Sequence, residues 1–214
     1  MARPEDGLVA VDEALALERA LAHPKGEAYC LWLRCEALAP MGRAADARQS
    51  ARASHSIASR LGHREWTAAA LKGQGAACLA DGDLAGAEAA FRACLETARR
   101  LPIFSGWAAA GLASTLVRSG DLDAAEGYVD QVFREGTPTT HYEGRLAEVE
   151  LAVARQDPEA ASLAARALDL AEDGGLLQSA ARLRCLLAAC AGSGGDGHAG
   201  QTPTEAGASD RRVG

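Results

Sequence analysis

The chain has 214 residues, of which 48% are hydrophobic and only 4% aromatic, and its formal net charge is −7 at pH 7. Alanine and leucine, both strong helix formers, supply most of the apolar residues, whereas the residue types that strands prefer are scarce. Basic residues cluster only in short pairs such as Arg99-Arg100 and Arg211-Arg212, so the chain lacks the basic face typical of nucleic-acid-binding proteins. We expect an all-α protein that does not bind nucleic acid directly.

The start of the chain and its apolar runs bear on the cellular compartment. Residues 1–7 are not followed by the long apolar run of a secretory signal. No apolar stretch approaches the roughly 20 residues needed to span a bilayer. The sequence therefore predicts a cytoplasmic protein without a membrane segment, in which the six cysteines are reduced thiols.

Apolar periodicity and helix-breaking residues divide the chain into ten expected helices. Their expected ranges are 8–21, 27–39, 43–61, 64–80, 84–101, 105–118, 122–135, from 138 towards 156, 158–172 and 177–191. Asp83 and Asp121 are expected to cap the helices that follow them, because their carboxylates can accept bonds from free backbone N–H groups. Thr137-Pro138 and Asp157-Pro158 each combine a capping residue with a proline at the first helical position.

A turn sequence recurs along these helices. Residues 80–88 return, with changes, as residues 117–126, and weaker copies lie at 40–47 and 155–161. The anchor residues Gly42, Gly82, Gly120 and Gln156 are separated by 40, 38 and 36 residues. A turn recurring at this period indicates one supersecondary unit stacked several times. We expect a short lead at 1–7, one helical repeat domain at 8–191, and a glycine-rich, disordered tail at 192–214.

The repeating unit has small residues where its two helices cross and a proline at its end. The best unit, Leu71–Pro102, carries at these places Gly75, Cys78, Gly82, Ala87, Phe91, Cys94 and Pro102. The corresponding residues of the other units are Cys35, Leu38, Gly42, Ala47, Ala51 and Ser54; Ala113, Leu116, Gly120, Ala125, Val129 and Val132; and Val149, Ala152, Gln156, Ala161, Ala165 and Leu168. Cys185, seven residues before Gly192, places the last helix as the first half of a fifth unit.

These units resemble tetratricopeptide repeats. The resemblance covers about residues 8–191 and implies a right-handed α-solenoid of antiparallel helix pairs. Because the units exceed the usual 34 residues, they are most similar to the repeat arrays of bacterial signalling ATPases and LuxR-type transcriptional regulators.

In this family the first helix of each pair lines a concave groove that binds a protein or peptide. Helical phasing then directs eight candidate side chains into that groove: Tyr29, Trp32, Glu36, Lys72, Trp107, Arg118, Glu143 and Glu150. Aromatic and arginine residues are common binding hot spots. The alternative is that Trp32, Trp66 and Trp107 fill gaps between alanine-rich helices.

The sequence contains no pattern that indicates catalysis, a metal site or a cofactor. Cys30 and Cys35 are five residues apart, as are Cys185 and Cys190, and on a helix this spacing turns the two thiols to different sides. Cys35, Cys78, Cys94 and Cys185 occupy positions where the repeat needs small interior residues. Metalloprotease, phosphate-loop and serine-hydrolase motifs are all missing from the sequence.

Three functions follow, in order of preference. The first is a non-enzymatic protein–protein interaction module that binds a peptide or protein segment along the groove. The second is a detached C-terminal sensor or regulatory arm of a larger bacterial signalling ATPase or transcriptional regulator, and the third is an enzyme. With either of the first two, self-association through an uncapped face of the first helix, formed by Leu8, Val11 and Leu15, is a further expectation.

Overall fold

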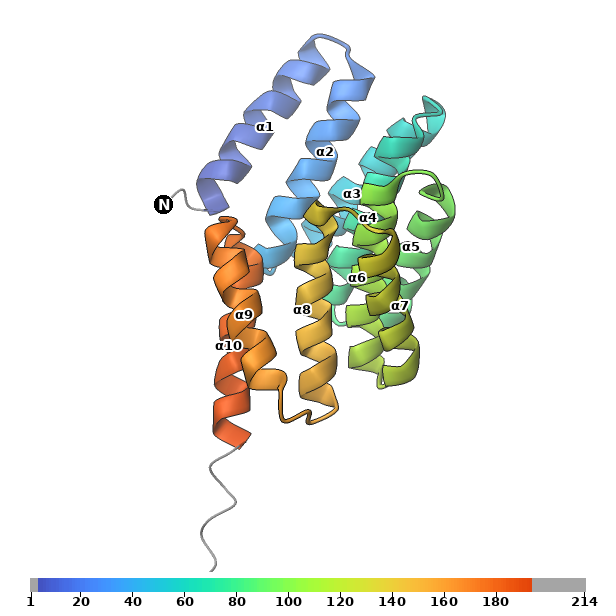
Figure 1. Cartoon of the computed structure of the whole chain (residues 1–214). Coiled ribbons are helices and arrows are strands. Elements are labelled where there is room, and N and C mark those ends of the chain that lie inside the picture. Colours follow the sequence, from blue (N-terminus) through green and yellow to red (C-terminus); the bar gives the residue numbers. More distant parts are fainter. Residues whose placement is uncertain (1–3, 194–214) are drawn as a thin grey trace, which may run out of the picture.

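The computed structural model describes residues 4–193, and these form ten α-helices, one short 3₁₀ helix and no β-strand (Figure 1). The helices are α1 Pro4–Ala20, α2 Pro24–Leu38, α3 Ala44–Arg60, α4 Arg64–Asp81, α5 Leu84–Thr97, α6 Pro102–Ser119, α7 Leu122–Glu135, α8 Pro138–Ala154, α9 Ala160–Asp173 and α10 Leu177–Ser193; the 3₁₀ helix is η1 Ala39–Met41. The all-α class is confirmed, and most helix boundaries lie close to those expected from the sequence.

In this part of the chain, substantial packing joins only successive helices or helices separated by one other helix in the sequence. Each helix contacts its successor, and the even-numbered helices α2, α4, α6, α8 and α10 also contact one another in that order. In Figure 1 the colours change step by step between adjacent helices, from blue α1 to orange α9 and α10. The buried side chains accordingly form several clusters along the row of helices, so each pair depends on its neighbours to cover its apolar faces.

The four residues that anchor the repeat share one backbone conformation. Gly42, Gly82 and Gly120 have φ angles of 75°, 80° and 88°, and Gln156 has a φ of 56°. Glycine adopts this left-handed conformation at a helix end without strain, whereas for a residue with a Cβ the conformation costs roughly 1–2 kcal/mol. The sequence repeat is therefore also a repeat of turn geometry, and the fourth turn keeps that geometry although it has lost its glycine.

The expected caps of α5 and α7 are confirmed. The Asp83 carboxylate accepts a hydrogen bond from the Gly86 N–H at 2.9 Å, and the Asp121 carboxylate accepts one from the Ala124 N–H at 3.2 Å. Pro138 is the first residue of α8, as its missing N–H allows. Local capping chemistry thus sets where these helices begin.

The fourth unit departs from the expected register. Asp157 accepts a bond from the Glu159 N–H at 2.8 Å, but α9 begins at Ala160 instead of Pro158. The buried positions also differ, falling one residue earlier than expected: Ala160, Ala164 and Ala167 are buried, whereas Ala161 and Ala165 are exposed. The prediction for this helix was wrong because Asp157-Pro158-Glu159 forms a turn of its own before α9, so the spacing of the units with glycine anchors does not carry over to this one.

Phe91 of α5 joins two consecutive pairs. Its side chain is only 2% exposed, and it packs against the helix backbone at Gly75 of α4 and at Gly111 of α6. A Cβ added at Gly75 would lie 2.7 Å from the ring, which is too close for any real contact. The absence of a side chain at these two glycines therefore sets how closely α5 approaches α4 and α6.

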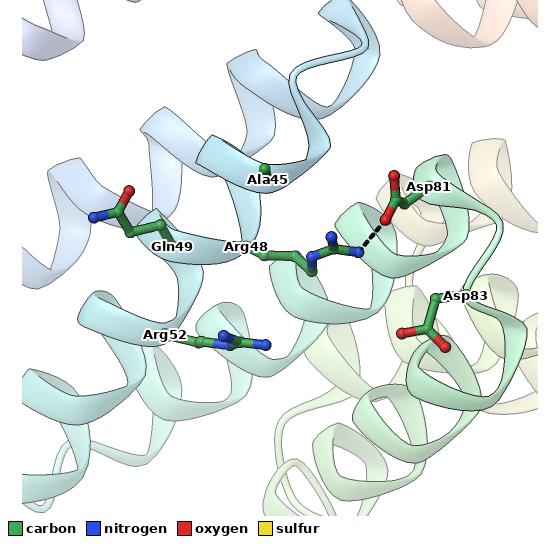
Figure 2. Close-up of a pocket in the computed structure, with 6 residues that line it drawn as sticks. All are labelled: Ala45, Arg48, Gln49, Arg52, Asp81 and Asp83. Atoms are coloured by element: carbon green, nitrogen blue, oxygen red, sulfur yellow. Dashed lines mark hydrogen bonds and ion pairs between the residues drawn. The ribbon is translucent and has the colours of Figure 1, made fainter.

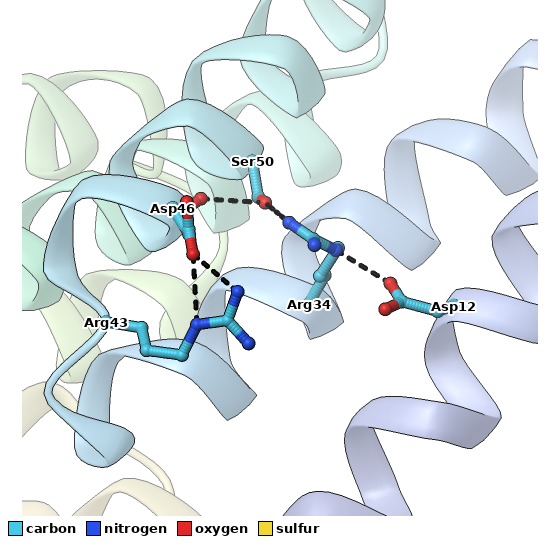
Figure 3. Close-up of polar contacts among 5 residues, drawn as sticks. All are labelled: Asp12, Arg34, Arg43, Asp46 and Ser50. Atoms are coloured by element: carbon cyan, nitrogen blue, oxygen red, sulfur yellow. Dashed lines mark hydrogen bonds and ion pairs between the residues drawn. The ribbon is translucent and has the colours of Figure 1, made fainter.

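The first helix is attached to the rest of the chain by apolar and polar contacts. Leu8 and Leu15 are 8% and 6% exposed because they pack in clusters with residues of α2. Arg34 of α2 donates to Asp12 of α1 at 2.7 Å and to Ser50 of α3 at 2.8 Å (Figure 3). The expectation of an uncapped Leu8–Val11–Leu15 face was therefore wrong: α2 covers Leu8 and Leu15.

The ends of the expected domain shift by a few residues. Helix α1 begins at Pro4, inside the expected lead of residues 1–7, and α10 ends at Ser193. The expected disordered tail at 192–214 lies outside the described residues except for its first two. None of the helices in residues 4–193 is both long enough and apolar enough to cross a bilayer.

Replacing Gln156 by glycine should raise the free energy of unfolding by about 1 kcal/mol, because glycine removes the strain of a left-handed residue with a side chain. Urea denaturation measures the change. The reciprocal substitution Gly120→Ala, at a matched turn, should lower stability by a similar amount. Equal stability of Gln156→Gly and the parent chain would show that this turn is unstrained.

A methyl group at Gly75 should destabilise the protein by about 1–3 kcal/mol, since the Phe91 ring is held between two helices and has no room to move aside. Gly127 of α7 is the matched control, because a Cβ there meets nothing within 4 Å. Gly127→Ala should stabilise the protein by roughly 0.5–1 kcal/mol through helix propensity alone. If Gly75→Ala were as stable as Gly127→Ala, the close packing at Phe91 would not limit stability.

Candidate functional site

Six of the eight candidate groove residues meet on one side of the even-numbered helices. Together with Trp66 of α4, they form what we call the tryptophan–lysine cluster: Tyr29, Trp32, Glu36, Trp66, Lys72, Trp107 and Glu143. Its members come from α2, α4, α6 and α8. Tyr29, Trp32 and Glu36 lie on the same face of α2 because their spacings of three and four residues follow the helical period.

The aromatic part of the cluster is continuous. The Tyr29 ring lies 4.9 Å from Trp66 and 5.7 Å from Trp32 between ring centroids. Trp32 in turn lies 5.9 Å from Trp66 and 6.5 Å from Trp107. Tilted aromatic pairs with centroids within about 7 Å stabilise a protein by more than the burial of their apolar surface alone. The rings thus join α2, α4 and α6 into one aromatic surface.

Lys72 is the charged centre of the cluster. Its ammonium lies 2.7 Å from Glu36 Oε2, 4.0 Å from Glu143 Oε1 and 5.5 Å from the centre of the Trp107 ring. Only 13% of its side chain is exposed. Burial alone would lower the pKa of Lys72, but Glu36 and Glu143 outweigh burial, and the net effect is a raised pKa. The ammonium therefore stays protonated and is shared by two carboxylates.

Glu143 is the less favourably placed of these two carboxylates. Burial raises its pKa, the nearby Lys72 lowers it, and the like charge of Glu36 raises it again, with a net increase above the ordinary value. Its side chain is nevertheless 36% exposed, so solvent weakens these effects. The cluster as a whole carries one positive and two negative groups.

Two polar atoms of α2 are not used inside the protein. Trp32 Nε1 and Glu36 Oε1 are buried and form no hydrogen bond with any described residue. A buried polar atom without a partner typically costs 1–3 kcal/mol. A donor and an acceptor thus stand one helical turn apart, in the middle of the cluster.

The remaining two candidates lie outside the cluster. Arg118 at the end of α6 donates to the Leu79 carbonyl of α4 at 2.5 Å. Glu150 of α8 is 7% exposed and pairs with Arg182 of α10. Both side chains tie neighbouring even-numbered helices together, and neither contacts the other six candidates.

Sequence reasoning missed Trp66, which it treated only as a possible gap filler. Trp66 stacks on His63 at 5.4 Å and contacts Tyr29 and Trp32. A usable signal was present in the repeat: Trp66 and Phe104 both lie 16 residues before their turn glycines, and Tyr29 and Trp107 both lie 13 residues before theirs. Aligning the aromatic positions in this way would have indicated two aromatic levels on successive units.

The buried cysteines have structural contacts. Cys35 and Cys94 are fully buried, and their thiols donate to the carbonyls of Gly73 and Ala68 at 3.3 and 3.2 Å. Burial raises the pKa of both thiols to about 12, so they remain protonated. Cys185 contradicts its expected interior position, because it is exposed on α10. Residues 4–193 contain no group of three or more His, Cys, Asp or Glu side chains placed to hold a metal ion.

An open depression of about 590 Å³ lies away from the cluster, between α3 and the α4–α5 turn (Figure 2). Its polar lining is largely engaged: Arg48 pairs with Asp81, and Asp83 caps α5. Arg52 extends into the depression from α3, as Figure 2 shows. These side chains do not combine a nucleophile with a base, so the depression is a weaker candidate than the tryptophan–lysine cluster.

Comparison with known proteins adds no assignment: no family model matches the chain, and no curated protein matches it either. The functional argument consequently depends on the geometry of the cluster.

Replacing Glu143 by glutamine should stabilise the protein at neutral pH. Because the folded-state pKa of Glu143 is raised, folding favours the protonated carboxyl group. The stability that the protonated group contributes is fully present below the ordinary carboxyl pKa and is lost as the pH rises through the folded-state pKa. The advantage of the variant over the parent should therefore shrink as pH falls towards 4. Urea denaturation between pH 4 and pH 8 measures this difference.

Glu126 provides a control of opposite sign. The hydrogen bond and charge of Arg155, 2.9 Å away, lower the pKa of Glu126, so this carboxylate stabilises the fold above its ordinary pKa and loses that effect on acidification. Glu126→Gln should be less stable than the parent at pH 7, with the gap closing in acid. Parallel pH profiles for the two variants would contradict both assignments.

Proposed function

We propose that the chain is a non-enzymatic protein-interaction module of tetratricopeptide-like architecture, a right-handed solenoid of antiparallel helix pairs. In this proposal, an extended peptide or protein segment binds along the tryptophan–lysine cluster. The observation that carries the proposal is the convergence of aromatic and charged side chains from four helices on one partly exposed surface. Tyr29 is 39% exposed, Glu143 36% and Glu36 30%.

The chemistry of the cluster indicates what kind of segment would bind. Large aromatic side chains supply contact area at low conformational cost and dominate many binding hot spots. Two carboxylates share one ammonium, which leaves the surface with excess negative charge. A partner segment with a lysine or arginine, or with free backbone N–H groups, would complement that charge.

The same contacts also support the alternative interpretation, in which the rings only fill space between helices. The two interpretations differ at Tyr29, which is the most exposed aromatic residue of the cluster. A space-filling residue affects stability, whereas a binding residue affects affinity for a partner. A regulatory arm of a larger signalling protein would use the same surface, so a test of Tyr29 applies to that function as well.

All three tryptophans of the chain belong to the cluster, so intrinsic fluorescence reports directly on its occupancy. Peptides selected from a displayed random library against the purified chain should change this fluorescence on titration. Tyr29→Ala should weaken the best peptide about tenfold or more, since truncating a hot-spot residue costs at least 1–2 kcal/mol.

Tyr128→Ala is the matched control, because Tyr128 lies on α7, where it contacts Arg92 and packs beside core residues that are not members of the cluster. Its affinity for the selected peptide should equal that of the parent. A selection that yields no peptide able to alter the tryptophan signal, or an equal loss in both tyrosine variants, would count against the proposed function.

A further inference from the structure

Helix α10 exposes positions that are buried in every preceding unit. In α2, α4, α6 and α8, the residues seven and four positions before the anchor residue of the following turn are buried. They are Cys35 and Leu38, Gly75 and Cys78, Ala113 and Leu116, and Val149 and Ala152. The corresponding residues of α10, Cys185 and Ala188, are exposed. In the four preceding units the next helix in the chain packs on these positions, and no described helix follows α10.

Helix α1, at the other end of the row, also has a side that no described helix covers. Helices α3, α5, α7 and α9 each pack between two even-numbered helices, whereas α1 packs extensively on α2 alone. Val9, Leu17 and Leu21, in α1 and just beyond it, are 58%, 65% and 73% exposed. With Leu170 and Leu177, they make up five of the eight large hydrophobic residues that are exposed in the described part of the chain. The exposed apolar surface is thus concentrated at the two ends.

The two end helices also carry opposite charge. Helix α1 contains the acidic residues Glu5, Asp6, Asp12, Glu13 and Glu18 and a single basic residue, Arg19. Helix α10 contains Arg182 and Arg184 and no acidic residue. Both arginines of α10 form ion pairs within the chain, with Glu150 and Glu172, but their side chains remain 49% and 58% exposed. On α1, Asp12 and Glu18 have partners within the chain, so the difference in net charge between the two helices remains. An acidic, partly apolar helix therefore complements the exposed face of α10.

We propose that copies of this chain associate head to tail, with α1 of one copy covering the exposed face of α10 of the next. In that position α1 takes the place that α3, α5, α7 and α9 each take on the helix before them. The contact joins two different surfaces, so it propagates into open chains or closes into a ring. Residues 194–214 are a poorer occupant of α10, because Val213 is their only sizeable aliphatic residue.

Two variants block one end each. Leu17→Glu places a charge in the exposed apolar face of α1, and Ala188→Glu does the same on α10, where it also repels the acidic α1. In sedimentation velocity the full-length parent should show an average mass that rises with concentration and falls with added salt. Each blocked variant alone should remain a monomer with unchanged circular dichroism.

The decisive experiment mixes the two blocked variants. Each retains one intact end, so an equimolar mixture should form a one-to-one dimer that does not grow further. Ala89→Glu, on an exposed position of α5, is the matched control and should associate like the parent. A parent that is monomeric at all concentrations, blocked variants that fail to combine, or association that appears only after deletion of residues 194–214 would each overturn the proposal.

Discussion

The constraint on which this structure depends is that no helix in the row covers its own apolar surface. Alanine-rich helices are thin, so they bury area only by approaching one another closely. That approach is possible because small residues stand at the crossings, with Phe91 filling the space that Gly75 and Gly111 leave open. Each internal pair is therefore held by the pair before it and the pair after it, and stability is distributed along the row instead of residing in one centre.

The same constraint produces the candidate site. Because alternate helices contact one another, side chains from α2, α4, α6 and α8 are brought within reach although they are far apart in sequence. Lys72 is the clearest case: its ammonium is largely removed from water and is kept charged by Glu36 and Glu143. The cluster thus ties the row of helices together and presents aromatic and acidic groups at the surface, which is the combination that our functional proposal uses.

The same constraint leaves the two ends of the row with uncovered faces. Internal helices are covered on both sides, whereas α1 and α10 each have a face that no described helix covers. The residues on those faces are not uniformly polar: Cys185 and Ala188 are as small or as apolar as their buried counterparts, and Val9 and Leu17 are exposed apolar residues of α1. A row that ends in such faces, with opposite charge at its two ends, is suited to continuing into another copy of itself.

Local chemistry made much of this fold predictable from the amino-acid sequence. Alanine and leucine content determined the helical class, and the glycine anchors and Asp83 and Asp121 marked turns and helix starts, because left-handed φ angles and capping bonds depend on a few adjacent residues. The register of α9 escaped prediction, since the length of the Asp157-Pro158-Glu159 turn depends on how the next helix docks. Only the tertiary structure decided that Trp66 joins the cluster, that Arg118 and Glu150 do not, and that Cys185 is exposed. Those outcomes depend on distances between helices, and such distances are set by how side-chain volumes pack across the whole row.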